Sequence, residues 1–467
     1  MGISDMIICV LFVMLASSYG WGMRGTVIGG EKGAMLPGAF IGLILARFAG
    51  GGIYENFWTV AAAGLMGMTY GGSETYGETI GFVLHRDAGR GYRPVKGYSG
   101  LFLKGALWFS ICGGFIAFAI SSMAGNKYSL ADIMIFCLLI PVFQLVGYYI
   151  FNTPYNKEKG IHPKCYYSRT RREEWGGNLV TLLALIALGI IRNDSLMLSM
   201  IWGGFLGGGL GWLAAMKFYE ATVFPVSNGK YIFDRFFRNG IYDGWKTMEF
   251  TLGAIGGAGV AIGFCRKISA VEEINGMIAS SGLNTLPPSA EKFMPLAVGL
   301  LAAGIIAVNA YGLYCDKKEK NCNTLLCDRI ERTLYNVIPM ALVLTGSAYA
   351  ARLMTVFMLV LVLGIKCVFE RFSESRLMPL YGAIALPVCG GVFAGDIILG
   401  GYGPFALIFA GTVPYLLAEL LHAMSKKRRA GRSIKDGLCK TAFATVYPCF
   451  LIMCTIIYIA SAKIFGF

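Results

Sequence analysis

The chain reads SGLFLKGALWFSICGGFIAFAISSM at residues 99–123. A helix needs about 20 mostly apolar residues to cross a bilayer, so this run is long enough. Its two flanks differ in charge. The connection that follows, near Asn126, is short and nearly neutral, whereas the preceding residues are basic, at Arg86, Arg90, Arg93 and Lys96. Because basic loops are retained in the cytosol, the run predicts a transmembrane helix that begins on the cytosolic side.

Working outward from this run, about fourteen apolar segments recur along the chain, and they predict an all-α polytopic integral membrane protein. Their approximate cores are 6–20, 33–48, 56–84, 99–123, 130–151, 175–191, 195–218, 245–264, 293–313, 334–350, 353–369, 377–399, 405–424 and 440–464. The division between 334–350 and 353–369 is the weakest, because only Ala351 and Arg352 separate them.

The connections between these segments alternate in charge. Basic residues gather near 86–96, 157–172, 230–238, 317–320, 371–376 and 426–435. The intervening connections near Asn126, Asp194 and Gly401 are nearly neutral, and the longest, 265–292, balances its basic residues with acidic ones. A missed helix would reverse the alternation downstream. The pattern therefore predicts an even number of helices, with the N- and C-termini outside the cell.

Composition supports the membrane class and excludes others. The 467 residues are 56% hydrophobic and only 15% charged, and 63 are glycine, which suits close helix packing in lipid. The net charge of +14 lies in alternate loops, so we expect a lipid bilayer and no nucleic acid as partner. The 13 cysteines show no disulfide or zinc spacing, and three histidines cannot build a multi-histidine metal site. No metal and no cofactor is predicted.

Three of the predicted helices begin in a similar way, at Tyr98-Ser99-Gly100, Tyr242-Asp243-Gly244 and Lys435-Asp436-Gly437. Ser and Asp commonly cap helix N-termini. The recurrence favours same-direction internal repeats, with a first helix bundle at 1–123, a second at 130–264, connecting helices at 293–350, and a C-terminal bundle at 353–467. No soluble domain is expected. Independent capping of three glycine-rich helices is the alternative.

The first candidate site lies between the first two apolar segments. Six glycines fall between Gly20 and Gly33, and the stretch also holds Trp21, Arg24, Glu31 and Lys32. Such a segment can leave helical geometry, and transporters place substrates at broken helices. Arg24 could hold a carboxylate or phosphate, with Glu31 and Lys32 pairing with each other or with the solute. An ordinary glycine-rich cytosolic turn is the alternative.

The second candidate site is Glu74 and Glu78, inside the run 56–84. On one helix, residues four apart share a face. Carboxylates within membrane segments often mark ion paths or proton relays, and two like charges raise at least one pKa. We expect this pair to contribute to the substrate site and to couple transport to a proton or sodium ion. Alternatively, the helix ends near Gly72 and both carboxylates lie in the cytosolic interface.

Other polar and small residues have simpler explanations. Gln144, Asn178 and Asn309 lie within apolar segments, where interhelical hydrogen bonds would account for them. The glycines between Gly203 and Gly211 predict close helix packing, because no strand precedes them as in a phosphate-binding loop.

These features predict a secondary transporter for a small polar, anionic solute in the plasma or inner cell membrane. The substrate site would comprise Trp21, Arg24, Glu31, Lys32, Glu74 and Glu78. One alternative is an integral-membrane transferase acting on a lipid-linked or phosphorylated substrate, although the enzyme signatures HExxH, GxSxG and the Walker lysine are missing and no catalytic residue is assigned. Another is a partner subunit or sensor without chemistry. A homo-oligomer is compatible with either.

Overall fold

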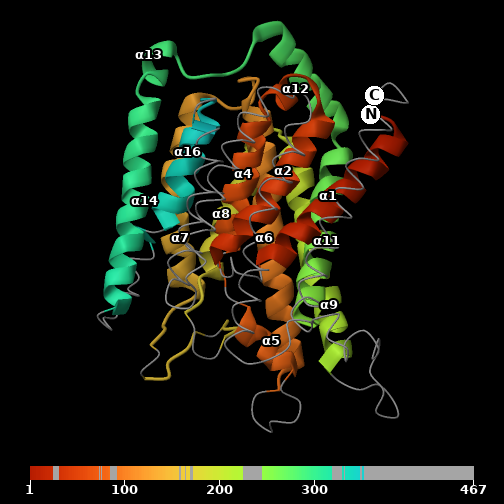
Figure 1. The fold of residues 1–467 in the computed structure, drawn as a ribbon, viewed down its shortest axis with the longest axis vertical. Helices are drawn as coiled ribbons and strands as arrows, with labels where there is room; N and C mark the ends of the chain where they lie inside the picture. The colour runs from red at the N-terminus through yellow and green to blue at the C-terminus, as the bar shows by residue number, and fades with distance from the viewer. Residues whose placement is uncertain are drawn as a thin grey trace, which may run out of the picture.

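The structure is a computed structural model that describes residues 1–24, 31–72, 74, 76–84, 92–156, 159–163, 165–168, 172–223, 244–317, 329–330, 332–347 and 350–351. Within these residues the chain is almost entirely helical (Figure 1). Its only strand-like pairing there is one isolated antiparallel bridge between Asn156 and Ile161. The predicted all-α class is therefore confirmed.

The helices follow one another with short connections. The first eight elements are α1 (Ile3–Arg24), η1 (Glu31–Ala34), α2 (Met35–Ala49), α3 (Gly51–Glu55), α4 (Phe57–Gly71), α5 (Gly77–Leu84), α6 (Pro94–Ser122) and α7 (Leu130–Phe151). The later ones are α8 (Trp175–Ile191), α9 (Ser195–Val223), α11 (Gly244–Cys265), α12 (Ile268–Ser281), α13 (Pro288–Glu291), α14 (Met294–Lys317), the π-helix η3 (Thr333–Val337) and α16 (Ile338–Leu344).

Six helices in the described part of the chain are long and apolar enough to cross a membrane. They cover Ile3–Gly22, Pro94–Ser122, Leu130–Phe151, Ser195–Val223, Thr247–Cys265 and Pro288–Val308. The helix α7 also turns large apolar side chains outward, with Leu138 69% and Ile150 63% exposed. Water hydrates such a face poorly, whereas acyl chains suit it. These helices indicate a membrane-embedded protein that crosses the bilayer several times.

The predicted segments can be compared with the observed helices one by one. Each of the ten segments before residue 353 contains helix in the structure. The four later segments and the C-terminal bundle at 353–467 lie outside the described residues. The count of fourteen spans, the internal repeats and the placement of both termini outside stay predictions.

The segment 56–84 was predicted as one continuous run, and this is wrong. The structure divides it into α4 and α5, with Gly72 to Tyr76 between them. Glycine stabilises a helix less than other residues do, and Gly71, Gly72 and Gly77 lie at the two helix ends that face the break. Glu74 therefore lies in the break and Glu78 in the first turn of α5, so the two do not share one helix face.

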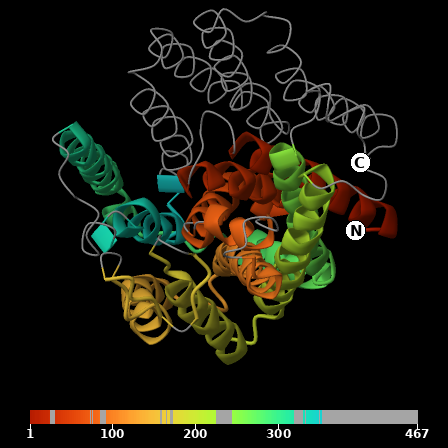
Figure 2. The same cartoon turned by 90° about the horizontal axis from the view of Figure 1, so that it is seen from below.

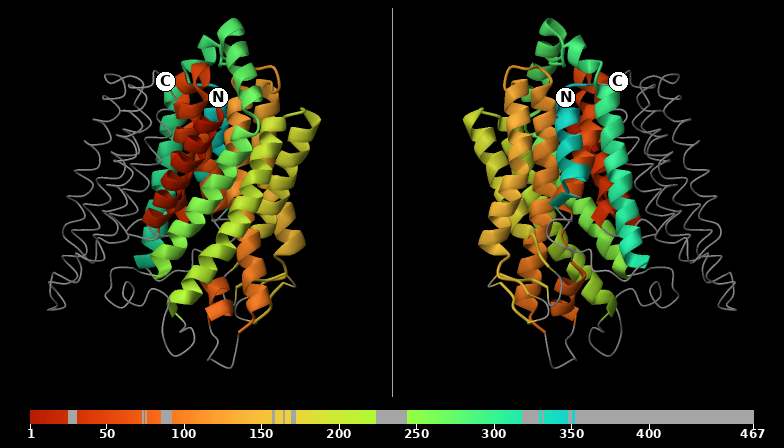
Figure 3. Two further views of the ribbon diagram at one scale, coloured as in Figure 1. Left: turned by 90° about the vertical axis from the view of Figure 1, so that its right-hand side faces the viewer. Right: turned by 90° about the vertical axis from the view of Figure 1, so that its left-hand side faces the viewer.

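The helix α6 forms the centre of the bundle, and 89% of the residues in its most apolar 18-residue stretch are buried. The helices α4 and α9 pack along it, α11 packs on α9 and α1, and α2 packs on α4. The pair α7 and α8 lies at the side (Figure 2). Viewed from the two sides, the axes of the long helices are roughly aligned with one another and extend from one end of the molecule to the other (Figure 3).

Glycines mark the closest helix crossings. At four of them, a side chain added to either glycine would collide with the carbonyl oxygen of the other. Small residues at crossings let helix backbones approach, which is how helices associate in lipid. The pairs are Gly38 with Gly64, Gly105 with Gly208, Gly147 with Gly176, and Gly203 with Gly259. The prediction of close packing at 203–211 is therefore confirmed.

Successive long helices point in opposite directions, so their connections alternate between the end near α5 and the end near α12 (Figure 1). Arg93 and Lys96 lie at the α5 end, because the backbone N–H of Arg93 donates to the carbonyl oxygen of Phe82 on α5 and Lys96 lies over the Phe82 ring. At the α12 end, Arg266 and Lys267 are accompanied by acidic residues on α12 and α13. This arrangement agrees with the alternation seen in the sequence. That the α5 end faces the cytosol stays a prediction.

Candidate functional site

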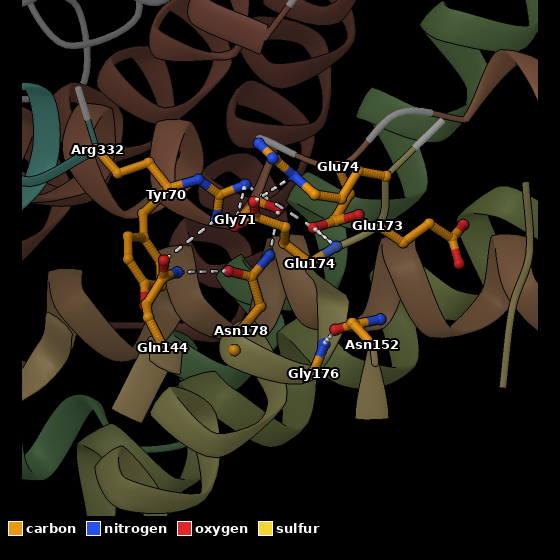
Figure 4. A network of polar contacts seen from close by, with 12 residues as sticks. Tyr70, Gly71, Glu74, Gln144, Asn152, Glu173, Glu174, Gly176, Asn178 and Arg332 are labelled. Atoms are coloured by element: carbon orange, nitrogen blue, oxygen red, sulfur yellow. Dashed lines mark hydrogen bonds and ion pairs between the residues drawn. The ribbon is translucent and has the colours of Figure 1, made fainter. Parts of the chain in front are cut away.

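A network of buried charged and polar groups occupies the break between α4 and α5, at the N-terminus of α8 and just before η3 (Figure 4). Its members come from parts of the chain that are distant in sequence. Most of them are among the side chains labelled in Figure 4: Tyr70, Glu74, Gln144, Glu173, Glu174, Asn178 and Arg332. Arg172 and Arg329 complete the ion pairs.

Glu74 lies in the break and is only 2% exposed. Its Oε1 accepts a hydrogen bond of 3.0 Å from the backbone N–H of Glu174, the residue that precedes the first turn of α8. Arg332 Nη2 lies 3.9 Å from the same oxygen. The carboxylate of Glu74 therefore meets the positive end of the α8 dipole, where a negative charge is favoured.

Glu174 is the centre of the ion pairs. Its Oε1 lies 3.3 Å from Arg172 Nε, and its Oε2 lies 2.9 Å from Arg329 Nη1 and 3.3 Å from Arg332 Nη2. Three guanidinium groups thus surround one carboxylate that is almost entirely buried. Arginine suits such a position because its planar group keeps its charge and donates in several directions.

Amide side chains connect these charges to the helices. Arg332 Nη1 donates to Gln144 Oε1 over 3.4 Å, and Arg329 donates to the same oxygen. Gln144 Nε2 donates to Asn178 Oδ1 over 3.4 Å, and Asn178 Nδ2 donates to the carbonyl oxygen of Gly71 over 3.2 Å. The predicted interhelical hydrogen bonding of Gln144 and Asn178 is confirmed. Asn178 also satisfies one of the carbonyls that the end of α4 leaves free.

The two carboxylates of the network have opposite electrostatic environments. Burial raises the pKa of Glu74 to about 7, against the opposing effect of Lys104 and Arg332. Burial alone would also raise the pKa of Glu174, but Arg332, Arg329 and Arg172 outweigh it and hold that pKa below its ordinary value. Both groups lie in connections outside the membrane-spanning helices. Neighbouring carboxyls with separated pKa values can divide the roles of proton carrier and fixed charge.

A second buried pair lies beside the network. Lys104 Nζ is 2.9 Å from Glu173 Oε1, and both side chains are fully buried. Lys104 also donates to Thr79 Oγ1 on α5 over 3.0 Å. Glu173 accepts hydrogen bonds from Ser168 Oγ and from the backbone N–H of Tyr167. This pair therefore fixes α5 and the segment before α8 onto α6, on the α5 side of the break.

Not every donor and acceptor of this region is satisfied within the described part of the chain. Arg329 Nε and Nη2 are buried there without a hydrogen-bond partner, and so is Asn336 Oδ1 in η3. Buried polar atoms without partners are uncommon and costly. η3 is moreover a π-helix, a rare form that is frequently found at functional sites. These features mark the region between α8 and η3 as a place where a polar ligand would find donors.

The residues predicted for the first candidate site lie only partly within the structure. The side chains of Arg24, Glu31 and Lys32 lie outside the described residues, although the backbone of α1 is helical as far as Arg24. Trp21 is fully buried and stacks on Trp108, with ring centroids 5.3 Å apart.

The second candidate site is only partly assembled. Glu74 belongs to the network, whereas Glu78 is half-buried in the first turn of α5. An aromatic cluster joins the two predicted regions, because Tyr76, in the break, packs on Trp108 at 5.8 Å. Tyr76 also donates to Glu249 Oε1 over 2.9 Å. Trp21 is therefore connected through Trp108 to Tyr76, which is two residues from Glu74 in the chain.

Sequence reasoning missed the arginines and two of the carboxylates of this network. Lys104 could have been noticed, because it is a charge in the middle of an apolar run, where charges usually have a function. Glu173 and Glu174 stand directly before an apolar run and follow a basic stretch. Arg329 and Arg332 share a helix face just before the segment 334–350, but nothing in the sequence points them at Glu174.

Within the described residues no group of three or more His, Cys, Asp or Glu side chains could hold a metal ion. Comparison of the chain with protein-family models finds no matching family. Comparison with curated proteins finds no match, and comparison with solved structures finds none either.

Proposed function

We propose that this protein is a secondary transporter of a small anionic solute in a cell membrane, coupled to protons through Glu74. The observation that carries the proposal is the cluster of three arginines around two carboxylates in the described part of the chain. Arg172, Arg329 and Arg332 face Glu174 and Glu74, and the pKa of Glu74 is raised to about 7 by burial. The nearby Lys104 is paired separately with Glu173.

A buried guanidinium group that has donor atoms without partners favours an anion. Arginine binds carboxylate and phosphate through two parallel hydrogen bonds, and buried charges require compensation. Arg329 has two buried donor atoms without partners in the described part of the chain. The N-terminus of α8 adds backbone donors and a positive dipole at the same point. A solute anion would exchange with the side chain of Glu174 for Arg329 and Arg332.

Proton coupling follows from Glu74. When Glu74 takes up a proton, the network loses one negative charge, so its affinity for an anion rises. By reciprocity, a bound anion raises the proton affinity of Glu74 by the same factor. The pKa of about 7 places this exchange at ordinary cellular pH. We therefore propose that one proton enters with each anion, and that solute affinity falls as the pH rises through about 7.

The residues of the first candidate site remain part of the proposal. Arg24, Glu31 and Lys32 would line the same solute path, because Trp21 is joined to the α4–α5 break through Trp108 and Tyr76. Glu78 stays a proposed second coupling site. The plasma or inner membrane is proposed as the location, with the basic α5 end in the cytosol.

The test is uptake into proteoliposomes driven by an inward proton gradient. Succinate and inorganic phosphate would be offered in turn, with proton entry followed by a pH-sensitive dye inside the vesicles and protein-free vesicles as the baseline. We expect at least one anion to carry protons inward. Replacing Arg332 with glutamine removes a charge-assisted contact and should lower uptake roughly 10- to 100-fold.

The matched control is Arg266→Gln, an exposed arginine at the α12 end, which should transport normally. If Arg332→Gln transports as well as the unchanged protein, the arginines do not bind the solute. If no small anion moves protons in the unchanged protein, the transporter proposal itself is wrong.

A further inference from the structure

A separate feature lies at the α5 end of the bundle, away from the buried network. A hollow of about 520 Å³ opens between the start of α6 and the segment 165–167. Its lining combines cations, aromatic rings and small polar groups. The residues are Arg93, Pro94, Val95, Lys96, Ser99, Cys165, Tyr166 and Tyr167.

Two positive charges meet in this hollow. Arg93 and Lys96 both line it, and neither forms an ion pair with a carboxylate in the described part of the chain. Lys96 Nζ instead lies over the rings of Phe82, at 5.1 Å, and Tyr166, at 5.5 Å. Those contacts hold the ammonium group at the wall of the hollow. Like charges repel, so an anion bound between the two side chains would relieve the repulsion.

The position of the hollow relative to the membrane indicates which anion. The helix α6 has 29 residues, so it is about 43 Å long at 1.5 Å per residue. That length matches a bilayer with its headgroups, which is about 40–45 Å thick, and exceeds the hydrocarbon core of about 30 Å. The first turn of α6 therefore lies at the depth of the lipid headgroups. At that depth the phosphodiester groups of the lipids themselves are the most abundant anions.

The apolar residues beside the cations point the same way. Val95, in the first turn of α6, is 82% exposed, and Tyr92, just before it, is 43% exposed. Exposed apolar side chains next to basic ones are typical of a surface that meets lipid, where aromatic rings settle at the headgroup level. The basic and apolar residues thus match the two parts of a phospholipid, its phosphate and the beginning of its acyl chains.

We infer that the hollow at the start of α6 binds the phosphodiester of an anionic phospholipid, with Arg93 and Lys96 as the phosphate ligands and Val95 against the lipid chains. Basic pockets between helices on the cytosolic side bind such headgroups in membrane proteins generally. The proposed phosphate ligands of this site, Arg93 and Lys96, are not part of the solute site, although Tyr167 in its wall donates its backbone N–H to Glu173 over 2.7 Å.

Cys165 provides a direct readout, because it lines the hollow and is exposed, whereas Cys9, Cys112, Cys137 and Cys265 are buried. The purified protein in detergent would react with a maleimide, and labelling of the Cys165 peptide would be followed by mass spectrometry. Short-chain phosphatidylglycerol, short-chain phosphatidylcholine and inorganic phosphate would be compared. We expect phosphatidylglycerol alone to slow the labelling of Cys165.

The variant Arg93→Gln/Lys96→Gln should raise the phosphatidylglycerol concentration needed for half-protection roughly thirtyfold, from the usual contribution of a basic residue to anionic-lipid binding. The matched control is Arg266→Gln/Lys267→Gln, two basic residues at the α12 end, which should leave protection unchanged. Both changes are at the surface and preserve the fold.

Three results would overturn the inference. One is the same protection by phosphatidylcholine, which would mean that the phosphate charge is not recognised. Another is equal protection by inorganic phosphate at the same concentration, which would make the site one for a free anion. The third is unchanged protection of Arg93→Gln/Lys96→Gln. Each result leaves the proposed transport activity untouched, because uptake depends on Arg332 and Glu74 and is measured separately.

Discussion

Replacing Glu74 with glutamine should stabilise the protein at high pH and leave it nearly unchanged at low pH. Burial raises the pKa of Glu74 from its ordinary value of 4.5 to about 7. The folded chain therefore binds this proton more tightly than the unfolded chain does. As the pH rises from about 4.5 to 7, ionisation favours the unfolded state, so this group costs stability that remains lost above pH 7. Glutamine cannot ionise and removes the loss.

The magnitude follows from the pKa values. A difference of about 2.5 pKa units, at about 1.4 kcal/mol each, corresponds to about 3 kcal/mol above pH 7. Glutamine keeps an oxygen that can accept the backbone N–H of Glu174, and it gives up only the 3.9 Å contact with Arg332. For a chain of this length, about 3 kcal/mol corresponds to a rise of roughly 3–6 °C in the unfolding midpoint.

The assay is thermal unfolding in detergent, followed by tryptophan fluorescence at several pH values between 5 and 8. The quantity compared is the difference in midpoint between Glu74→Gln and the unchanged protein. The control is Glu273→Gln, an exposed carboxylate on α12, whose difference should not vary with pH in the same way. A Glu74→Gln difference that stays constant from pH 5 to 8 would refute the reasoning, because it would mean that the carboxyl is not held protonated.

Two further predictions concern packing and the buried ion pair. Gly208→Ala should destabilise the fold by about 2 kcal/mol, because the new methyl group meets the carbonyl oxygen of Gly105. The control is Gly276→Ala on α12, where the methyl group meets nothing within 4 Å and the change should be neutral or slightly stabilising. Thermal unfolding compares the two variants. Lys104→Met should cost about 3–5 kcal/mol by leaving Glu173 buried and unpaired, and Lys104→Met/Glu173→Gln should recover most of that loss. Equal unfolding midpoints for the single and double variants would show that the pair has no such role.

Much of the fold could be predicted from hydropathy and charge, because both act locally. Each segment such as 99–123 or 175–191 has the length and composition of a helix, and a loop's charge depends only on its own residues. The break at Gly72 was predicted only as the alternative to a continuous helix, and the structure supports that alternative. Hydropathy averaged over 56–84 is apolar, so it does not register a change of direction within the segment.

The candidate site was only partly predictable, because its members interact across the bundle. Glu74 could be selected as a carboxylate within an apolar run, and Gln144 and Asn178 as polar groups in helices. Arg329 and Arg332 resembled ordinary basic residues at the end of a loop. Their role depends on Glu174, which lies far away in the sequence and reaches them only when α8 packs beside η3.

The glycines also show the difference between what the local sequence reveals and what depends on contacts across the bundle. Gly208 is required because the backbone of Gly105 lies opposite it, whereas Gly77 has nothing within 4 Å and lies at the start of α5, after the break. In the sequence both are glycines of a glycine-rich membrane protein. The first kind lets α6 and α9 pack closely together. The second only marks the end of the break in which Glu74 reaches the N-terminus of α8, and a side chain would fit there. The proposed transport would need both a fixed frame and an irregular segment that exchanges one charged partner for another. In that proposal the break at Glu74 would supply the irregular segment, and the glycine crossings around α6 would supply the frame.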